Sequence, residues 1–228
     1  MAPPRQLFWN GLHVPYIAPW SREEPLPRTV LRIRGRGGEG IGFADELSAA
    51  DRRHGVLWMR YSLARGAGRP DLAGVHPLRQ RQAMSHMLCQ VCGKSTYDDP
   101  AYERWGERHL VLMRAADGRP ISEGERTATP PVCEPCAVES VRACPHLRKG
   151  YTAALVKRAQ PWGVAGVLYH PETLKPILPK PKDSKDGLTE VSFDQPSIRW
   201  VLAARDVATL HGCTTVDLER LAAQGVAA

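Results

Sequence analysis

The sequence predicts an α+β fold with a β-rich N-terminal part, a four-cysteine module in the middle and a C-terminal pair of helices. Three observations support this prediction. Apolar and polar residues alternate in segments of the first 75 residues, as they do in half-buried strands. Two CxxC pairs lie on either side of residues 93–132. Beyond residue 195, apolar residues recur every three or four positions, which is typical of amphipathic helices.

The length and composition are those of a globular chain. Its 228 residues are 43% hydrophobic and 24% charged, which is enough apolar material for a buried core. No apolar run has the length of a signal peptide or a membrane span, so we expect a cytoplasmic protein with reduced thiols. We expect four parts: a β-rich region at 1–75, a zinc module at 76–150, a strand and proline-rich loop at 151–195, and the helical pair at 196–228. Within the third part, residues 151–158 have a pattern that fits a helix, and residues 163–169 are expected to form a buried strand.

The elements before the first cysteine pair are two strands and a helix. Residues 29–34 and 54–62 have strand-like patterns, and Pro77 is well placed in the first turn of a helix that runs to about residue 88. The glycine-rich residues 35–40 form either a phosphate-binding loop or a plain hairpin loop. They lack the Lys-Ser/Thr ending of a P-loop, which favours the hairpin.

Four of the six cysteines have the spacing of a metal site. Cys89 and Cys92 stand in CQVCGK, and Cys133 and Cys136 stand in VCEPC. Two CxxC loops complete a tetrahedral Zn²⁺ site, and thiolate ligands select zinc or iron over Mg²⁺ or Ca²⁺. We expect one structural Zn²⁺, because four protein ligands leave no position for water. A redox pair or disulfides are the alternatives, but neither explains two pairs around a hairpin.

A hairpin and a helix are predicted around the second half of this site. The hairpin has a strand at 109–115, a turn at 117–118 and a return strand from residue 121. The helix carries the last two ligands, with Pro135 in its first turn, and stops at Pro145.

This order of knuckle, hairpin and helix resembles a treble-clef zinc domain over about residues 76–148, and it is similar to the frame of HNH-type endonucleases. In that family a His on the first hairpin strand acts as general base beside a bound metal. The resemblance places His109 at the position of the general base. On the helix, Glu139 is the potential metal ligand nearest to the position that follows the last cysteine. Arg108 stands where the family carries a metal ligand, and Asn10 is the single Asn of the chain, so the family's middle Asn is missing. We therefore expect the treble-clef scaffold of this family without its nuclease activity.

Two further Cys/His pairs suggest a second metal site. Cys144 and His146 form CPH, and His211 and Cys213 form HGC. The alternative is that Cys144 is an ordinary buried residue on the apolar side of its helix, as lone cysteines often are. We favour the alternative.

The tail is predicted to form two helices joined at Gly212. Ala208 is small where the helices would cross, and Leu218 and Leu221 would face the first helix. This resembles a helix-turn-helix unit, whose second helix reads the DNA major groove. A plain helical hairpin packed on the body gives the same pattern, so both interpretations stay open.

The net charge of +7 is unevenly distributed. Residues 28–81 hold 11 basic and 5 acidic side chains, and residues 142–182 hold 8 basic and 1 acidic. If these blocks converge, they form a surface for phosphate whose affinity falls with salt. The alternative is solvated Arg on unrelated faces. The excess of 24 Arg over 7 Lys also follows from a high-GC coding sequence.

Three functional hypotheses follow. The first is non-catalytic nucleic-acid binding, and the second is a protein-interaction adaptor whose zinc module presents a surface to a partner. An HNH-like nuclease using His109 and Glu139 is third, and no membrane or small-molecule partner is expected. The expected phosphate contacts of the first hypothesis are Arg32, Arg34, Arg36, Arg79, Arg81, Arg148, Lys149, Lys157 and Arg158.

Overall fold

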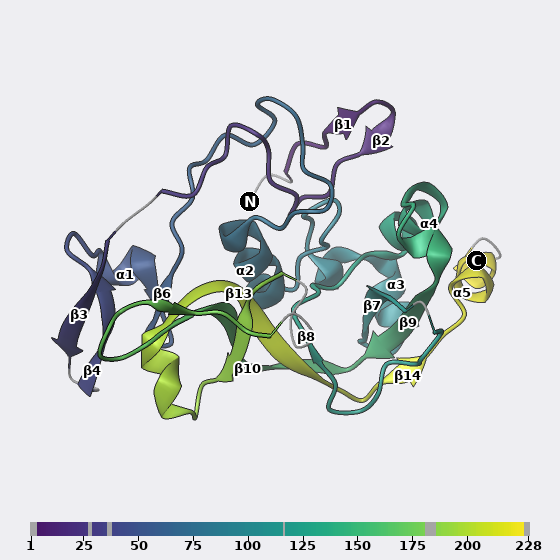
Figure 1. Ribbon diagram of the computed structural model, residues 1–228. Helices are drawn as coiled ribbons and strands as arrows, with labels where there is room; N and C mark the ends of the chain where they lie inside the picture. The colour runs from purple at the N-terminus through teal and green to yellow at the C-terminus, as the bar shows by residue number, and fades with distance from the viewer. Residues whose placement is uncertain (1–3, 27–28, 36–37, 116, 181–185, 226–228) are drawn as a thin grey trace.

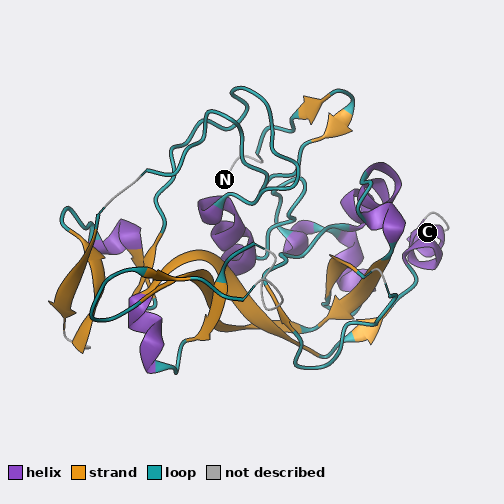
Figure 2. Cartoon of the chain, viewed as in Figure 1, coloured by secondary structure: helices purple, strands orange, loops and turns teal. Residues whose placement is uncertain are grey.

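The computed structural model of the protein describes residues 4–26, 29–35, 38–115, 117–180 and 186–225. Strands predominate in this part of the chain, and they form one large sheet, one small sheet and two separate hairpins (Figures 1 and 2). The predicted α+β fold with a C-terminal helical pair is therefore wrong, because the protein is mostly β.

Two long antiparallel strands form the centre of the large sheet. They are β10 (Arg158–Tyr169) and β13 (Val201–His211), and glycines let the neighbouring strands approach β10 closely. A Cβ atom at Gly163 would lie 2.2 Å from the carbonyl oxygen of Val191. The short strands of this sheet are β5 (Arg52–Arg53), β6 (Val56–Trp58), β8 (Arg126–Thr127), β11 (Pro176–Ile177) and β12 (Thr189–Ser192).

The small sheet is continuous in sequence with the large one. It has the order β14 (Thr214–Thr215), β9 (Tyr151–Val156) and β7 (His109–Arg114). Strand β9 leads into β10 through Lys157, and β13 leads towards β14 through Gly212, which has a φ of +66°. A Cβ atom at Gly212 would lie 2.8 Å from Cβ of Lys157. The chain therefore passes between the two sheets twice at the same place, from β9 to β10 and from β13 to β14. The close approach there requires glycine at position 212.

Helix α2 (Pro77–His86) lies between the large sheet and a layer of loops. The Gln80 amide donates to the carbonyl oxygens of Ala128 at 2.8 Å and Asp206 at 2.9 Å, and accepts from the Asp206 N–H. Residues 14–26 and 59–76 form the loop layer and hydrogen-bond to each other above α2 (Figure 1). A buried polar contact thus anchors α2 to β13.

The remaining elements gather at the two ends of the molecule (Figure 1). One end holds the small sheet with η1 (Thr96–Asp98), α3 (Pro100–Arg104), α4 (Glu134–Ala143), η2 (Leu147–Lys149) and α5 (Leu218–Gly225). The other holds β3 (Val30–Gly35), β4 (Gly38–Phe43), α1 (Ser48–Asp51) and η3 (Pro196–Trp200). The hairpin of β1 (Phe8–Trp9) and β2 (Leu12–His13) projects above α4.

The tail differs from its prediction because tertiary hydrogen bonding overrides local preference. Its sequence VLAARDVATLH suits a helix by composition, but as β13 it pairs with β10 on one side and with β6 and β8 on the other. Val201, Ala203, Val207 and Leu210 are buried there, which small and β-branched side chains allow. The predicted first helix of the pair is strand β13, and only the second, α5, is an α-helix in the described tail. The helix-turn-helix prediction is therefore wrong.

The elements around the cysteines are partly as predicted. The helix after Cys133 and the helix beginning at Pro77 are confirmed, and so are strands at 30–35, 56–58 and 163–169. The hairpin is wrong, because β7 pairs along its length with β9 and meets the predicted return segment only at a single bridge between Leu110 and Val132. Residues 151–158, whose pattern also fits a helix, form β9 and the start of β10.

No helix in the described residues is long and apolar enough to cross a membrane. The four-part division of the chain stays a prediction.

Candidate metal centre

The four predicted cysteines come together at the small-sheet end of the molecule. The Sγ atoms of Cys89, Cys92, Cys133 and Cys136 all lie within 4.8 Å of one another. The Sγ atoms of Cys92 and Cys133 are 3.8 Å apart. Four sulfurs at tetrahedral corners about 2.3 Å from a zinc ion would be separated by about 3.8 Å. The geometry fits a metal ion of this class.

The first knuckle is shaped by Gly93. Its φ is +72°, and its N–H donates to the carbonyl oxygen of Cys89 at 2.8 Å. The Cys92 N–H points at the Cys89 sulfur at 3.5 Å, as expected of a ligand loop. A Cβ atom at residue 93 would lie 2.8 Å from the Tyr16 ring. Glycine is therefore needed for the left-handed turn and for the approach of the N-terminal segment.

The second pair lies at the beginning of α4. Cys133 is the N-cap residue of the helix, and Cys136 is in its first turn. The Asp99 carboxylate accepts from the Glu134 N–H at 2.9 Å, which satisfies one free donor at this helix end. The Gln90 N–H donates to the carbonyl oxygen of Pro131 at 2.9 Å and so ties the two cysteine loops together.

Burial and mutual hydrogen bonding set the state of the thiols. Cys89 is fully buried, and Cys133 is half-buried. The side-chain hydrogen bond with Cys133 is the main cause that raises the pKa of the Cys136 thiol. The pKa of Cys92 is lowered, first by its hydrogen bond with Cys133. The sulfurs thus share protons, because like charges oppose complete ionisation, and a bound dication would remove that opposition and release protons.

The N-terminal segment covers the centre, which sequence reasoning missed. The Tyr16 N–H donates to the carbonyl oxygen of Val91 at 2.8 Å, and the Gln6 amide donates to that of Cys92 at 3.0 Å. The His13 imidazole lies beside Cys136 and Glu139. No periodicity or motif links residues 6–16 to the cysteines, so these contacts depend entirely on the tertiary fold.

The second Cys/His site, which the sequence suggested but did not favour, does not assemble in the described part of the chain. Cys144 ends α4, whereas His211 and Cys213 lie at the end of β13 beside Glu123. The His211 Nδ1 is 3.0 Å from a Glu123 carboxylate oxygen, and the Cys213 N–H donates to the other oxygen at 3.2 Å. Among the described residues, the sets of three or more Cys, His, Asp or Glu side chains that lie close enough to share a metal ion do not include Cys144, His146, His211 or Cys213.

His109 lies inside the fold and cannot meet a polymer substrate. It is 4% exposed, and burial lowers its pKa to about 4. The Thr96 hydroxyl donates to the carbonyl oxygen of Met87 at 2.7 Å, so the Nδ1–H of His109 is the donor to Thr96 Oγ1 at 2.8 Å. The Tyr97 and Tyr102 rings lie 4.7 and 4.9 Å from the imidazole. The other predicted nuclease residue, Glu139, binds His13 instead.

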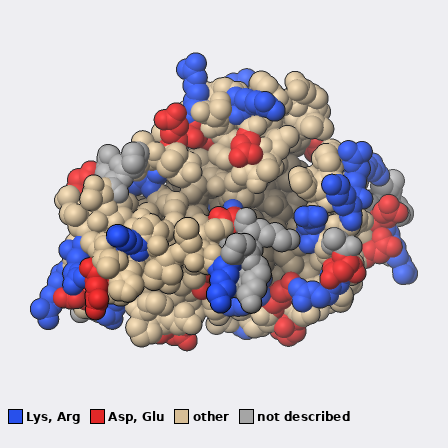
Figure 3. Space-filling view, viewed as in Figure 1, with Lys and Arg blue, Asp and Glu red and all other residues tan. Residues whose placement is uncertain are grey.

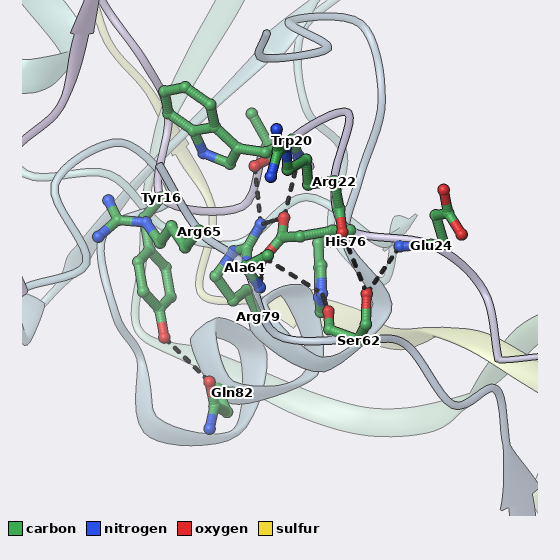
Figure 4. A network of polar contacts seen from close by, with 12 residues as sticks. Tyr16, Trp20, Arg22, Glu24, Ser62, Ala64, Arg65, His76, Arg79 and Gln82 are labelled. Carbon is green, nitrogen blue, oxygen red and sulfur yellow. Dashed lines mark hydrogen bonds and ion pairs between the residues drawn. The ribbon is translucent and has the colours of Figure 1, made fainter. Parts of the chain in front are cut away.

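Two of the predicted phosphate contacts are engaged inside the protein. Arg79 is 4% exposed, and both its terminal nitrogens lie 2.6 Å from Glu23 carboxylate oxygens. Figure 4 shows Arg79 enclosed near Trp20 and His76. Arg81 is half-buried over the Trp58 ring, at 4.6 Å. The prediction that Arg79 contacts phosphate is therefore wrong, because the side chain is an internal ion-pair partner.

The other predicted contacts that the structure describes are exposed but lie on separate parts of the molecule. Arg32 and Arg34 lie on β3, and Arg32 donates to the carbonyl oxygens of Pro171 and Glu172. Arg148 and Lys149 lie at the opposite end beside α4 (Figure 1). The exposed Lys157 and Arg158 mark the change of sheet, and Arg36 lies outside the described residues. The two basic blocks touch where Arg32 meets residues 171–172, but Arg148 and Lys149 of the second block lie at the other end of the molecule from Arg32.

Comparisons with known proteins add no assignment. No protein-family model matches the chain, and no curated protein or solved structure matches it at a significant level.

Proposed function

We propose that Cys89, Cys92, Cys133 and Cys136 hold one structural Zn²⁺. The observation that carries the proposal is the group of four sulfur atoms within 4.8 Å, formed by two loops that reach the site from different parts of the chain. Such an ion would join the end of α2, the beginning of α4 and, through the knuckle, the N-terminal segment. Reduced thiols are needed for it, which suits the cytoplasm.

Metal analysis of the purified protein tests this assignment. We expect zinc in the wild type, and its loss from the centre in Cys133→Ser. Iron with thiolate charge-transfer absorption would overturn the zinc assignment but keep the metal centre. Absence of metal, with all four thiols reactive under native conditions, would overturn both.

We further infer that the protein is a non-catalytic nucleic-acid-binding protein, with phosphates contacted beside the metal centre. Support comes from the exposed cations of α4 and η2, which are Arg142, Arg148 and Lys149. Figure 3 shows Lys and Arg side chains gathered over the end of the molecule where α4 lies. Three cations within eight positions would attract a phosphate backbone without reading its sequence. This patch includes Arg142, which was not among the contacts expected from the sequence.

The inferred binding has a salt-dependent signature. Each phosphate contact contributes about 0.9 to the slope of log affinity against log salt on duplex DNA, so neutralising all three cations should lower the slope by roughly 2 to 3. The test compares the triple variant Arg142→Gln, Arg148→Gln, Lys149→Gln with the wild type on duplex and single-stranded DNA and RNA. A variant with Arg5, Arg22 and Arg69 changed to Gln is the matched control, because it removes three exposed cations outside the patch and outside the contacts expected from the sequence.

Equal losses in both variants would show a diffuse charge effect and overturn the assignment to this patch. Absence of nucleic-acid binding would favour the protein-interaction adaptor. The first surface to test in that case is the β1–β2 hairpin, where Phe8 is 60% exposed and Leu12 is 37% exposed.

A further inference from the structure

A solvent-open cavity of about 840 Å³ lies directly beside the four-cysteine centre. Cys92, Cys133 and Cys136 line one side of it, and His13 lines another. Asp98, Asp99 and Lys94 also face the cavity, so its charged lining outside the thiols is one cation and two carboxylates. A Zn²⁺ ion with four thiolates carries a formal charge of −2. The cavity is therefore a negatively charged environment that favours a further cation.

Three potential ligands meet at the edge of this cavity. The donor atoms of His13, Cys136 and Glu139 all lie within 4.8 Å of one another. The distance from His13 Nδ1 to Glu139 Oε2 is 3.1 Å. Nitrogen and oxygen ligands at about 2.0 to 2.2 Å from one zinc ion would be about 3.3 to 3.6 Å apart at the tetrahedral angle. The imidazole and the carboxylate are thus already near the spacing that a shared metal ion requires.

Two elements hold these ligands in place. Glu139 follows Cys136 by three positions on α4, so both side chains lie on the same face of the helix. His13 ends β2 and is 9% exposed at its side chain. The Phe8 ring stacks on its imidazole at 4.9 Å. The helix and the hairpin therefore position the three donors before any ion binds.

The hydrogen bonds of Gln6 leave His13 Nδ1 as the atom that needs a cation. The Gln6 amide nitrogen donates to the carbonyl oxygens of Pro4 at 2.6 Å and Cys92 at 3.0 Å. The Gln6 oxygen must then accept from His13 Nε2–H, at 2.9 Å. In the neutral imidazole the Nδ1 lone pair would face the Glu139 carboxylate. A positive charge, either a proton or a metal ion, belongs between them.

We propose that His13 Nδ1, Glu139 Oε2 and the Cys136 thiolate bind a second divalent ion of the zinc class, with water at the fourth position. The Cys136 sulfur has lone pairs enough to bridge this ion and the first one. One sulfur, one nitrogen and one oxygen ligand suit Zn²⁺ better than Mg²⁺ or Ca²⁺. This inference rests on the proposed zinc at the four cysteines. Unlike that closed site, it leaves a position for a water molecule or an anion from the cavity.

Zinc counting on the full-length protein tests the site. The protein is dialysed to equilibrium against micromolar free Zn²⁺, and bound metal is measured by mass spectrometry. We expect two zinc ions per chain in the wild type, and one in both His13→Ala and Glu139→Gln. The second variant keeps the shape of the side chain, so it separates a lost ligand from a displaced hairpin. His146→Ala removes an exposed imidazole outside the site and should keep two ions.

Thiol reactivity shows whether the first centre survives in each variant. We expect the four ligand thiols to stay protected in His13→Ala and Glu139→Gln. One zinc ion in the wild type would overturn the second site and leave the first intact. Two ions in the wild type and also in both variants would place the second ion elsewhere and equally overturn the inference. Zero ions would overturn the proposed function as well, so the two failures are distinguishable.

Discussion

The N-terminal segment is held to the body of the protein at two places, and the charges of the buried groups are balanced differently at each. Near residues 6–16 it lies over the four cysteines, where the proposed metal ion would balance the charges of the thiolates. Near residues 18–23 it is held by the Glu23–Arg79 pair, in which two parallel hydrogen bonds of 2.6 Å satisfy each charge with the other. The second junction is complete within the chain. The first would be completed by the proposed ion.

Metal removal should have the largest effect, and it should weaken the junction over the cysteines while the Glu23–Arg79 junction stays intact. Structural zinc sites contribute about 10 to 16 kcal/mol of apparent binding free energy. With chelator, or in Cys136→Ser, we expect fast hydrogen exchange in residues 88–156, while β10 and β13 keep slow exchange. Mass spectrometry of exchanged peptides gives the regional readout. Uniform exchange across both regions, or no change at the cysteine loops, would contradict an ion-dependent end.

Breaking the buried pair should have the second largest effect. Glu23→Gln leaves the Arg79 charge buried without a partner, which costs about 3 to 5 kcal/mol of unfolding free energy. The double variant with Arg79→Met removes both charges and should recover much of that loss in urea titrations. Glu190→Gln breaks the exposed pair with Arg126 and should cost at most about 1 kcal/mol. Equal costs for Glu23→Gln and Glu190→Gln would show that burial of the pair is not decisive.

Acid should weaken the Glu23 junction by a smaller and graded amount. Burial by itself would raise the pKa of Glu23, but hydrogen bonds from Arg79 and from the Trp20 N–H outweigh it and hold the pKa below the usual 4.5. A lowered carboxyl pKa contributes stability that is present above pH 4.5 and is lost as the pH falls through the lowered value. Asp51, paired with Arg60, shifts in the same direction.

The readout is the difference in unfolding free energy between wild type and Glu23→Gln, followed from neutral pH into the acid range. That difference should shrink as Glu23 becomes protonated, since the variant has no carboxylate to lose. A constant difference at every pH would contradict a titrating contribution from this residue.

The predictions that held were those with local physical causes. The CxxC spacing identified the sulfur cluster, because each pair needs only four residues: a turn at Gly93 completes the first pair, and the first turn of α4 holds the second. Proline in the first turn identified α2 and α4. Alternation identified the strand at β3, and an apolar run at 163–169 identified part of β10, where Gly163 and Gly166 mark close backbone approaches.

What the tertiary structure decided was the choice of partner for each segment. The tail contains alanines that suit a helix, but β13 gains hydrogen bonds along both edges from strands distant in sequence. Arg79 resembles a surface cation until the fold places Glu23 beside it. His13 and Glu139 are 126 residues apart, and only the packing of β2 against α4 makes them neighbours. Local spacing determines how a loop can hold a metal, whereas burial and long-range pairing determine which charges face solvent.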